Sequence, residues 1–265
     1  MQLVTMKLYY HAPMTLKLLK ENKLISPVSA REKLLEEYCQ AHQLEVTFEW
    51  INGQYWLHSQ NEKERPIGIE IDQELKRHED FFKKSSLQKE LLAKAIGVKG
   101  PHRPKILDLS SGLLGDSLLF LSFGCEVISL ERNPIVAFLI FSAMENAQHP
   151  SLSRFKFYQT EALTFLESRP EVEVIYFDPM FEDANAKSLP KKEMRIFRDL
   201  VGKDTDSEEV FKRALEQGVK RVVVKRPRLS IPLLMSPPLE FVGKSTRYDV
   251  YLSQNNGPFA SNLLK

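Results

Sequence analysis

The feature that most limits the fold is an alternation of short apolar runs with helical segments along the second part of the chain. The runs expected to form strands cover 105–110, 126–131, 155–159, 173–178 and 221–227. The segments expected to be helical cover 116–124, 134–147, 161–168, 191–201 and 206–218. Strands that alternate with helices favour a parallel sheet with right-handed crossovers. Since 239–243 and 248–253 are expected to close the sheet as an antiparallel pair, the sequence predicts an α/β fold with a mostly parallel, doubly wound sheet.

The first part of the chain has a different pattern. The segment 29–43 predicts a helix with Ser29 as its N-cap. Two runs, 44–51 and 55–59, predict a hairpin, because the Asn-Gly pair in the turn 52–54 supplies the positive φ that such a turn needs. We expect the aromatic residues of this hairpin to be core rather than base-stacking residues.

The two patterns predict two parts of unequal size. Residues 1–66 are expected to form a small α/β subdomain and 67–265 the main domain. The length of 265 residues allows one large domain with such an appendage. A short strand at 68–72, followed by a basic helix from about 73 to 96, is expected to open the main domain.

Composition excludes several classes of protein. Hydrophobic residues make up 43% of the chain and charged residues 27%, which argues against disordered and fibrous classes. The longest apolar stretch, 135–144, is too short to span a membrane, and the N-terminus lacks the features of a secretory signal. Cys39 and Cys125 belong to no CxxC or His/Cys cluster, so we expect buried thiols and no bound metal. These features predict a soluble cytoplasmic protein.

Positive charge is concentrated in two segments, although the net charge of the whole chain is only +2. The segment 76–105 holds nine Lys and Arg against three Asp and Glu, and 187–228 holds 13 against seven. If the fold brings the two segments together, they would attract a polyanion. Solvated helix faces explain the same pattern equally well, so charge alone does not identify the partner.

Chemistry is expected at the carboxyl ends of the parallel strands, where ligands bind in such sheets. The first of these strands leads through Gly112 and Gly115 into a helix, a turn that lets backbone N–H groups approach a polar ligand. The next strand ends in Glu131, 23 residues after Asp108, where a carboxylate can accept hydrogen bonds from ribose hydroxyls. An ion pair with the adjacent Arg132 is the structural alternative. The pattern predicts an adenosine-containing cofactor, either NAD or S-adenosylmethionine (SAM).

The fourth strand ends in Asp178-Pro179-Met180-Phe181, and this motif separates the two cofactors. The exocyclic amine of a nucleobase is a poor nucleophile, because its lone pair is delocalised into the ring. A carboxylate and a backbone carbonyl held by proline can orient that amine, and an aromatic ring can stack on the flipped base. Asp-Pro alone is also a common turn signal. Combined with the glycine turn and Glu131, it predicts a SAM-dependent methyltransferase with Asp178, Pro179 and Phe181 as catalytic residues.

Several sequence blocks carry a resemblance to a known family: ERNPIVA (131–137), YFDPMF (176–181), SLPKKEMRIFRDLVG (188–202) and KRVVVKRP (220–227). From about Ile67 to Tyr251 the chain resembles the bacterial ribosomal RNA small subunit methyltransferase J family. The resemblance implies a class I methyltransferase fold with SAM as the cofactor. It also implies methylation of N2 of one guanine in 16S rRNA, so the small ribosomal subunit is the expected partner.

The resemblance also implies cofactor contacts. The residues concerned are Gly115, Asp116, Glu131, Arg132, Glu161, Ala162 and Asp178, and Gly112 belongs to the same glycine turn. This turn departs from the family, because the Gly-x-Gly spacing becomes Gly112-Leu-Leu-Gly115 and an arginine is lost at position 115. In addition, Glu161-Ala162 stands where a small hydroxyl pair is expected, and 78–90 replaces a Gly- and Arg-rich loop.

Basic residues near these blocks are expected to contact RNA. Lys191, Lys192 and Arg195 follow the Asp-Pro motif by about one loop and one helical turn, where they could hold phosphates beside a flipped guanine. Lys225 and Arg226 leave a strand beside the site, and the family pattern favours contact with RNA or substrate. An ion pair with acidic residues of the site is the alternative.

Other functions stay open at this point. The chain could methylate an amine of DNA adenine or of another RNA, because the sequence does not encode the target directly. It could also be a ribosome-assembly or RNA-binding factor that lost cofactor binding through the altered glycine turn. A nicotinamide-dependent oxidoreductase is less favoured, since it gives no reason for the Asp-Pro-x-Phe motif.

Overall fold

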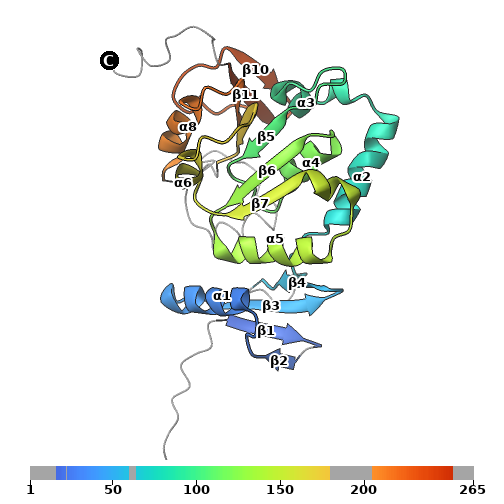
Figure 1. The fold of residues 1–265 in the computed structure, drawn as a ribbon, viewed down its shortest axis with the longest axis vertical. Coiled ribbons are helices and arrows are strands. Elements are labelled where there is room, and N and C mark those ends of the chain that lie inside the picture. Colours follow the sequence, from blue (N-terminus) through green and yellow to red (C-terminus); the bar gives the residue numbers. More distant parts are fainter. Residues whose placement is uncertain (1–15, 22, 60–63, 180–204, 253–265) are drawn as a thin grey trace, which may run out of the picture. The chain divides into compact units, whose positions relative to one another are not determined.

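The computed structural model describes residues 16–21, 23–59, 64–179 and 205–252 of the chain. The chain divides into two compact units, Met1–Gly68 and Ile69–Lys265 (Figure 1), and each is described separately below. The expected domain boundary at 66/67 stays a prediction. Among the described residues, no helix is both long enough and apolar enough to cross a membrane.

The first unit is a four-stranded sheet with one helix. Its elements are β1 (Leu16–Lys20), β2 (Lys23–Ile25), α1 (Ala30–Ala41), β3 (Val46–Ile51) and β4 (Gln54–Leu57). The strand order is β2-β1-β3-β4, in which β1 and β3 are parallel and the other pairs antiparallel. The strands β1 and β2 were not predicted from the sequence. They are only five and three residues long.

Capping and turn chemistry explain α1 and the hairpin that follows it. The Ser29 hydroxyl accepts a hydrogen bond from the Glu32 N–H (3.2 Å), and the Glu32 carboxylate accepts one from the Ser29 N–H (2.8 Å). This reciprocal pair satisfies two otherwise unpaired donors at the helix start. Asn52 and Gly53 have positive φ values of 51° and 88°, as a two-residue hairpin turn requires. The predicted N-cap and hairpin are confirmed.

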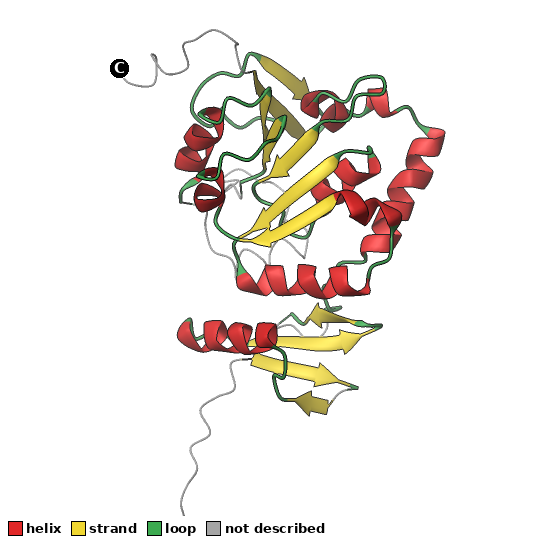
Figure 2. Cartoon of the chain, viewed as in Figure 1, coloured by secondary structure: helices red, strands yellow, loops and turns green. Residues whose placement is uncertain are grey.

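The second unit contains the alternating strands and helices (Figure 2). Its strands are β5 (Lys105–Asp108), β6 (Glu126–Glu131), β7 (Phe155–Gln159), β8 (Val174–Phe177), β9 (Arg221–Pro227), β10 (Leu239–Val242) and β11 (Thr246–Leu252). Its helices are α2 (Ile71–Lys84), α3 (Leu91–Ile96), α4 (Gly115–Ser122), α5 (Pro134–Asn146), α6 (Ala162–Leu166) and α8 (Ser207–Leu215), with short 3₁₀ helices η1 (Leu87–Lys89) and η2 (Pro150–Arg154).

The order of the strands confirms the predicted fold class. The sheet runs β10-β11-β9-β8-β5-β6-β7; the five strands from β9 to β7 are parallel, and β11 and β10 pair antiparallel at one edge. The chain first winds outward from β5 through β6 to β7, then returns to β8 on the other side of β5 and continues to β9. The carboxyl ends of β5 and β8 therefore flank a topological switch point, where ligands bind in sheets of this type.

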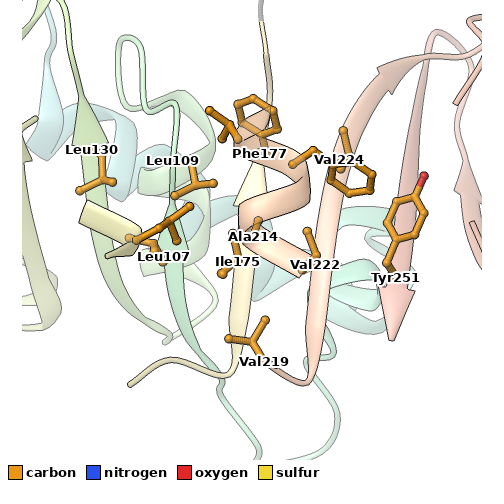
Figure 3. Close-up of a cluster of buried hydrophobic side chains, with 13 residues drawn as sticks. Leu107, Leu109, Leu130, Ile175, Phe177, Ala214, Val219, Val222, Val224 and Tyr251 are labelled. Atoms are coloured by element: carbon orange, nitrogen blue, oxygen red, sulfur yellow. The ribbon is translucent and has the colours of Figure 1, made fainter. Parts of the chain in front are cut away.

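Both faces of this sheet are buried. On one face, Leu107 of β5, Ile175 of β8 and Val222 of β9 belong to a cluster that Ala214 of α8 joins (Figure 3). On strands, neighbouring residues point to opposite faces. On the other face, the Tyr176 ring contacts Phe120 of α4, with the ring centroids 4.9 Å apart. Because helices cover both faces, the carboxyl ends of the strands are the part of the sheet that a ligand can reach.

Two sequence predictions at the start of this unit are wrong. The segment 68–72 is not a strand, because α2 begins at Ile71 and buries Ile71 and Leu75 one helical turn apart. The expected single helix from 73 to 96 is three pieces, since Ser85 adopts an extended backbone (φ −123°, ψ 150°) that ends α2. The predicted helix 191–201 lies outside the described residues.

Candidate active site

The loops after β5 and β8 meet at the switch point. The Leu109 N–H donates to the Tyr176 carbonyl (3.0 Å), and the Asp178 N–H donates to the Ser110 hydroxyl (2.8 Å). A cleft opens here, lined by Leu109, Ser110, Gly112, Leu130, Glu131, Arg132, Val136, Thr160, Glu161, Ala162, Phe177, Asp178, Asp206 and Val210. The fold thus brings together the ends of four neighbouring strands, as the sequence analysis expected.

Glu131 links the glycine turn to the start of α5. One oxygen of its carboxylate accepts from the Gly112 N–H (3.1 Å) and the other from the Asn133 N–H (2.8 Å). Gly112 has a φ of 49°, which suits glycine, whereas Leu114 takes a φ of 64° at the N-cap of α4. These bonds hold the Glu131 carboxylate beside the cleft that it lines, where a carboxylate is expected to accept hydrogen bonds from ribose hydroxyls.

Arg132 forms ion pairs with two acidic side chains that also line the cleft. Its Nη1 lies 3.1 Å from Asp206 Oδ2 and 3.7 Å from Glu161 Oε2. Asp206 immediately precedes α8, and the sequence analysis did not identify it as a site residue. The only local signal at this position is the acidic first turn of α8, a pattern that also stabilises a helix start on its own. The ion pair joins residues 74 positions apart, so no local pattern predicts it.

The chemistry of the lining fits a cationic adenosine cofactor. Four of the lining residues are acidic (Glu131, Glu161, Asp178 and Asp206), and one, Arg132, is basic. Such an excess of carboxylates favours a positively charged group. Leu109, Leu130 and Phe177 supply the apolar surface that a planar base needs. No group of three or more His, Cys, Asp or Glu that could hold a metal ion occurs among the described residues.

A second polar cluster connects Asp178 with α4. The Lys225 ammonium lies 2.8 Å from Asp116 Oδ2 and 2.9 Å from Asp178 Oδ2, and the Tyr176 hydroxyl donates to Asp116 Oδ2 (2.5 Å). Burial alone would lower the pKa of Lys225, but the carboxylates of Asp178 and Asp116 outweigh it and raise that pKa above its usual value. Burial, followed by the charges of Asp116 and Asp178, also raises the pKa of Tyr176 far above its usual range.

Asp108 is a buried carboxyl beneath the glycine turn. It accepts hydrogen bonds from the Ser117 hydroxyl (2.5 Å) and the Ser110 N–H (3.1 Å), and the Ser117 hydroxyl also contacts the Ser129 hydroxyl (2.6 Å). Burial raises the pKa of Asp108 to about 7, despite these hydrogen bonds. At neutral pH a large fraction of this carboxyl therefore keeps its proton in the folded protein.

The predicted site residues occupy several environments. Gly112, Glu131, Arg132, Glu161, Ala162 and Asp178 line the cleft. Gly115 and Asp116 are not among the lining residues that the structure describes; Gly115 is the exposed first residue of α4, and Asp116 joins the Lys225 cluster. Pro179 is buried directly after Asp178. Phe181, Lys191, Lys192 and Arg195 lie outside the described residues.

Lys225 and Arg226 of β9, which were predicted to contact RNA or substrate, both make contacts within the protein. Lys225 makes the ion pairs named above, the alternative that had been weighed for it. Arg226 is only 6% exposed, and its Nη2 donates to the Ile231 carbonyl (2.6 Å). Contact of either residue with RNA stays a prediction.

Comparisons with known proteins identify relatives of this chain. A family model described as "Putative SAM-dependent methyltransferase" matches residues 30–253. A protein named ribosomal RNA small subunit methyltransferase J from Thioalkalivibrio sulfidiphilus is 41% identical over 177 residues, covering 63% of this chain and 69% of the relative. Its namesake from Coxiella burnetii is 42% identical over 170 residues (62% and 66%), and that from Bdellovibrio bacteriovorus 40% over 201 residues (74% and 78%).

A solved structure shows the same fold. The crystal structure of a SAM-dependent methyltransferase from Neisseria gonorrhoeae matches with a TM-score of 0.63 at 24% identity, covering 91% of this chain and 97% of that one.

The fold and the family model together define a class I SAM-dependent methyltransferase, with SAM as its cofactor. Within this class, the chain belongs to the ribosomal RNA small subunit methyltransferase J family. Of the two adenosine cofactors that the sequence left open, SAM is therefore the correct one. The nicotinamide-dependent alternative is set aside.

Proposed function

We propose that the protein transfers a methyl group from SAM to the exocyclic N2 of one guanine in 16S rRNA of the small ribosomal subunit. The names of its relatives support ribosomal RNA of the small subunit as the substrate. The observation that carries the proposal is the position of Asp178. It follows β8 at the switch point, is hydrogen-bonded to Ser110 of the neighbouring loop, and lines the same cleft as Glu131.

The proposed chemistry is positioning of a weak nucleophile. When bound, SAM supplies an electrophilic methyl group on a positively charged sulfur. Asp178 and the Pro179 carbonyl accept hydrogen bonds from the guanine amine and hold it in line with that group. The fixed backbone of Pro179, which is buried, keeps the carbonyl in place. Phe181 stacks on the flipped base in this proposal.

The residues proposed to hold the cofactor surround the cleft. Glu131 accepts from the ribose hydroxyls, and Gly112 lets the loop backbone approach the ligand closely. Arg132, Glu161 and Ala162 border the adenine end. Gly115 and Asp116, at the start of α4, and Asp178, after β8, complete the predicted set.

The proposed partner is RNA in the cytoplasm, where ribosomal subunits are assembled. Lys191, Lys192 and Arg195 are proposed to bind phosphates on both sides of the flipped guanine. Phosphate contacts of this kind position the nucleic acid without reading its sequence.

The proposal is tested by transfer of tritiated methyl groups from SAM to small subunits of a strain that lacks this gene. Fully modified subunits are the control. We expect label only on the unmodified subunits, recovered as N2-methylguanosine after digestion to nucleosides. Label in another nucleoside, or on another RNA, would show a different amino-methyltransferase. No label together with no binding of SAM would favour the RNA-binding factor.

The role of Asp178 needs a separate comparison. Asp178→Ala is expected to lose nearly all transfer, while its melting temperature without cofactor stays close to that of the wild type. Ser168→Ala serves as the control variant, because it removes an exposed hydroxyl that donates to the Phe165 carbonyl. Near-full transfer by Asp178→Ala with unchanged folding would show that Asp178 does not orient the amine.

A further inference from the structure

We propose that Lys225 is a positioning residue that fixes the Asp178 carboxylate, rather than a contact to RNA phosphates. The catalytic consequence of this inference rests on the proposed function, whereas its structural part does not. It assigns Lys225 to the interior of the site.

The geometry joins three elements at one ammonium group. Lys225 comes from β9, Asp116 from the first turn of α4, and Asp178 from the end of β8. The ammonium lies 2.8 Å from one carboxylate and 2.9 Å from the other. All three side chains are mostly covered, with exposed fractions of 28% for Lys225, 21% for Asp116 and 34% for Asp178. An ammonium held by two short ion pairs is not displayed towards solvent, as a phosphate-binding lysine needs to be.

We call the arrangement in which Lys225 bridges Asp116 and Asp178 the clamp. The charges of the three groups explain why the clamp matters for the Asp178 carboxylate. Two carboxylates that share one ammonium can both stay ionised, because each is within about 3 Å of the positive charge. Without Lys225, the Asp178 carboxylate would face the negative charge of Asp116 alone and would take up a proton more readily. A protonated Asp178 would accept fewer hydrogen bonds and could not orient an amine as well.

Other titratable groups face this cluster from the surrounding strands. Tyr176 of β8 donates to Asp116, and its raised pKa keeps it neutral near pH 7. Tyr248 of β11 is also neutral there, because burial and then the charge of Asp116 raise its pKa to about 12. Asp108 of β5, whose pKa is raised to about 7, titrates near neutrality. An experiment must therefore observe Asp178 itself and compare variants that all keep Asp108.

The first test measures the ionisation of Asp178 in the cofactor-free protein. Carbon-13 NMR follows the Asp carboxyl signals with pH, and Asp178→Asn identifies the signal of Asp178. Lys225→Met is expected to move its titration midpoint up by about 1–3 pH units, whereas Lys225→Arg, which keeps the charge, moves it much less. Lys220→Met is the control. Lys220 lies just before β9 and pairs with Glu173, so its removal is expected to leave the titration midpoint of Asp178 unchanged. An unchanged midpoint in Lys225→Met would overturn the inference.

The second test separates a clamp from an RNA contact. For a clamp, Lys225→Met lowers kcat about tenfold or more, moves the acid limb of the kcat–pH profile upward, and is partly rescued by Lys225→Arg. For a phosphate contact, the same variant raises KM and reduces the slope of log KM against log salt by about one. That second pattern would contradict the clamp. If the wild type itself transfers no methyl group, the proposed function fails, and the NMR titration still decides the role of Lys225.

Discussion

Two glycines of the same turn make different demands on the backbone. Gly112 has a φ of 49°, whereas Gly115 has ordinary helical geometry at the start of α4. No described atom outside the immediate chain lies within 4 Å of a Cβ added at either position. The difference between the two residues is therefore conformational strain alone, which makes them a matched pair.

Gly112→Ala is expected to lower the free energy of unfolding by roughly 1–2 kcal/mol, because alanine is strained at positive φ. Gly115→Ala is expected to change it by less than about 0.5 kcal/mol or to stabilise the protein slightly. Chemical denaturation followed by circular dichroism measures both. Equal losses for the two variants would mean that the turn does not hold the backbone described above.

The raised pKa of Asp108 predicts that the free energy of unfolding depends on pH in a defined direction. Its pKa is about 7 in the folded protein and 3.8 without the fold, so the folded state binds the extra proton between these values. The contribution of Asp108 to stability is fully present below about pH 4 and is lost as the pH rises to about 7. The loss is at most about 1.4 kcal/mol per pH unit.

The comparison with Asp108→Asn isolates this effect, because asparagine has nearly the same shape and does not titrate. The Ser117 hydroxyl can turn to accept from the new amide and donate to Ser129. We expect the wild-type free energy of unfolding minus that of Asp108→Asn to fall as the pH rises from 4 to 7. A difference that rises or stays flat over this range would show that Asp108 ionises normally.

Local sequence patterns predict some residues of the site and miss others. Glu131 and Asp178 were found because each ends a strand, and strand ends follow from the local pattern. Asp206 was not found, and ion pairing of Lys225 was only the less favoured interpretation, because the partners of both residues lie far along the chain. Which opposite charge a side chain meets depends on the tertiary fold. Binding by these residues therefore stays a prediction, although their shared location is observed.

At the scale of single elements, α1 depends on its capping box. Besides the two reciprocal bonds with Ser29, the Glu32 carboxylate accepts from the Tyr55 hydroxyl of β4 (2.8 Å), which ties the helix start to the sheet. Burial opposes the ionised form, but hydrogen bonds from Ser29, Val28 and Tyr55 outweigh it, so the pKa of Glu32 is lowered. The helix start therefore carries an ionised, hydrogen-bonded carboxylate.

Ser29→Ala is expected to cost about 1 kcal/mol of stability in the first unit. Both tryptophans of the chain, Trp50 and Trp56, lie in this unit, so their fluorescence during denaturation reports its unfolding. Gln40→Ala is the control, because Gln40 is an exposed residue in the last turn of the same helix, away from the capped end. A loss no larger for Ser29→Ala than for the control would contradict the capping role.

Elements with local signals were predicted well, and those without were not. β6, β7 and β9 begin and end at the predicted residues, since apolar runs bounded by polar residues define them. The start of α2 was mistaken for a strand because Ile69 and Ile71 alternate with polar residues over too short a distance to show the helical period. The short strand β1 is placed by pairing with β3, and β2 by pairing with β1, which no local pattern reveals.

At the scale of the whole molecule, the most predictable feature was the mostly parallel, doubly wound sheet with its antiparallel closing pair. Alternating strands and helices leave few topologies, because crossovers are right-handed and the closing pair is antiparallel. The order of the strands places the cleft at the switch point between β5 and β8, where the cofactor of the family is expected to bind. The substrate does not, because a fold carries no record of the RNA that it binds.

Cofactor binding is expected to stabilise the second unit by mass action. SAM at 100 times its dissociation constant adds about 2.7 kcal/mol, which raises the melting temperature by several degrees. NAD at the same concentration is expected to give no shift. Glu131→Gln keeps the size of the side chain but removes its charge, and a smaller shift in this variant would support the ribose contact. Equal shifts in Glu131→Gln and wild type would argue against it.

The central claim is that this chain methylates N2 of one guanine in 16S rRNA through Asp178. The most direct measurement is mass spectrometry of nucleolytic fragments of 16S rRNA from a strain that lacks the gene, complemented with the wild type or with Asp178→Ala. We expect one N2-methylguanosine to be absent from the deletion strain, restored by the wild type, and not restored by Asp178→Ala. A full set of N2-methylguanosines in the deletion strain would contradict it.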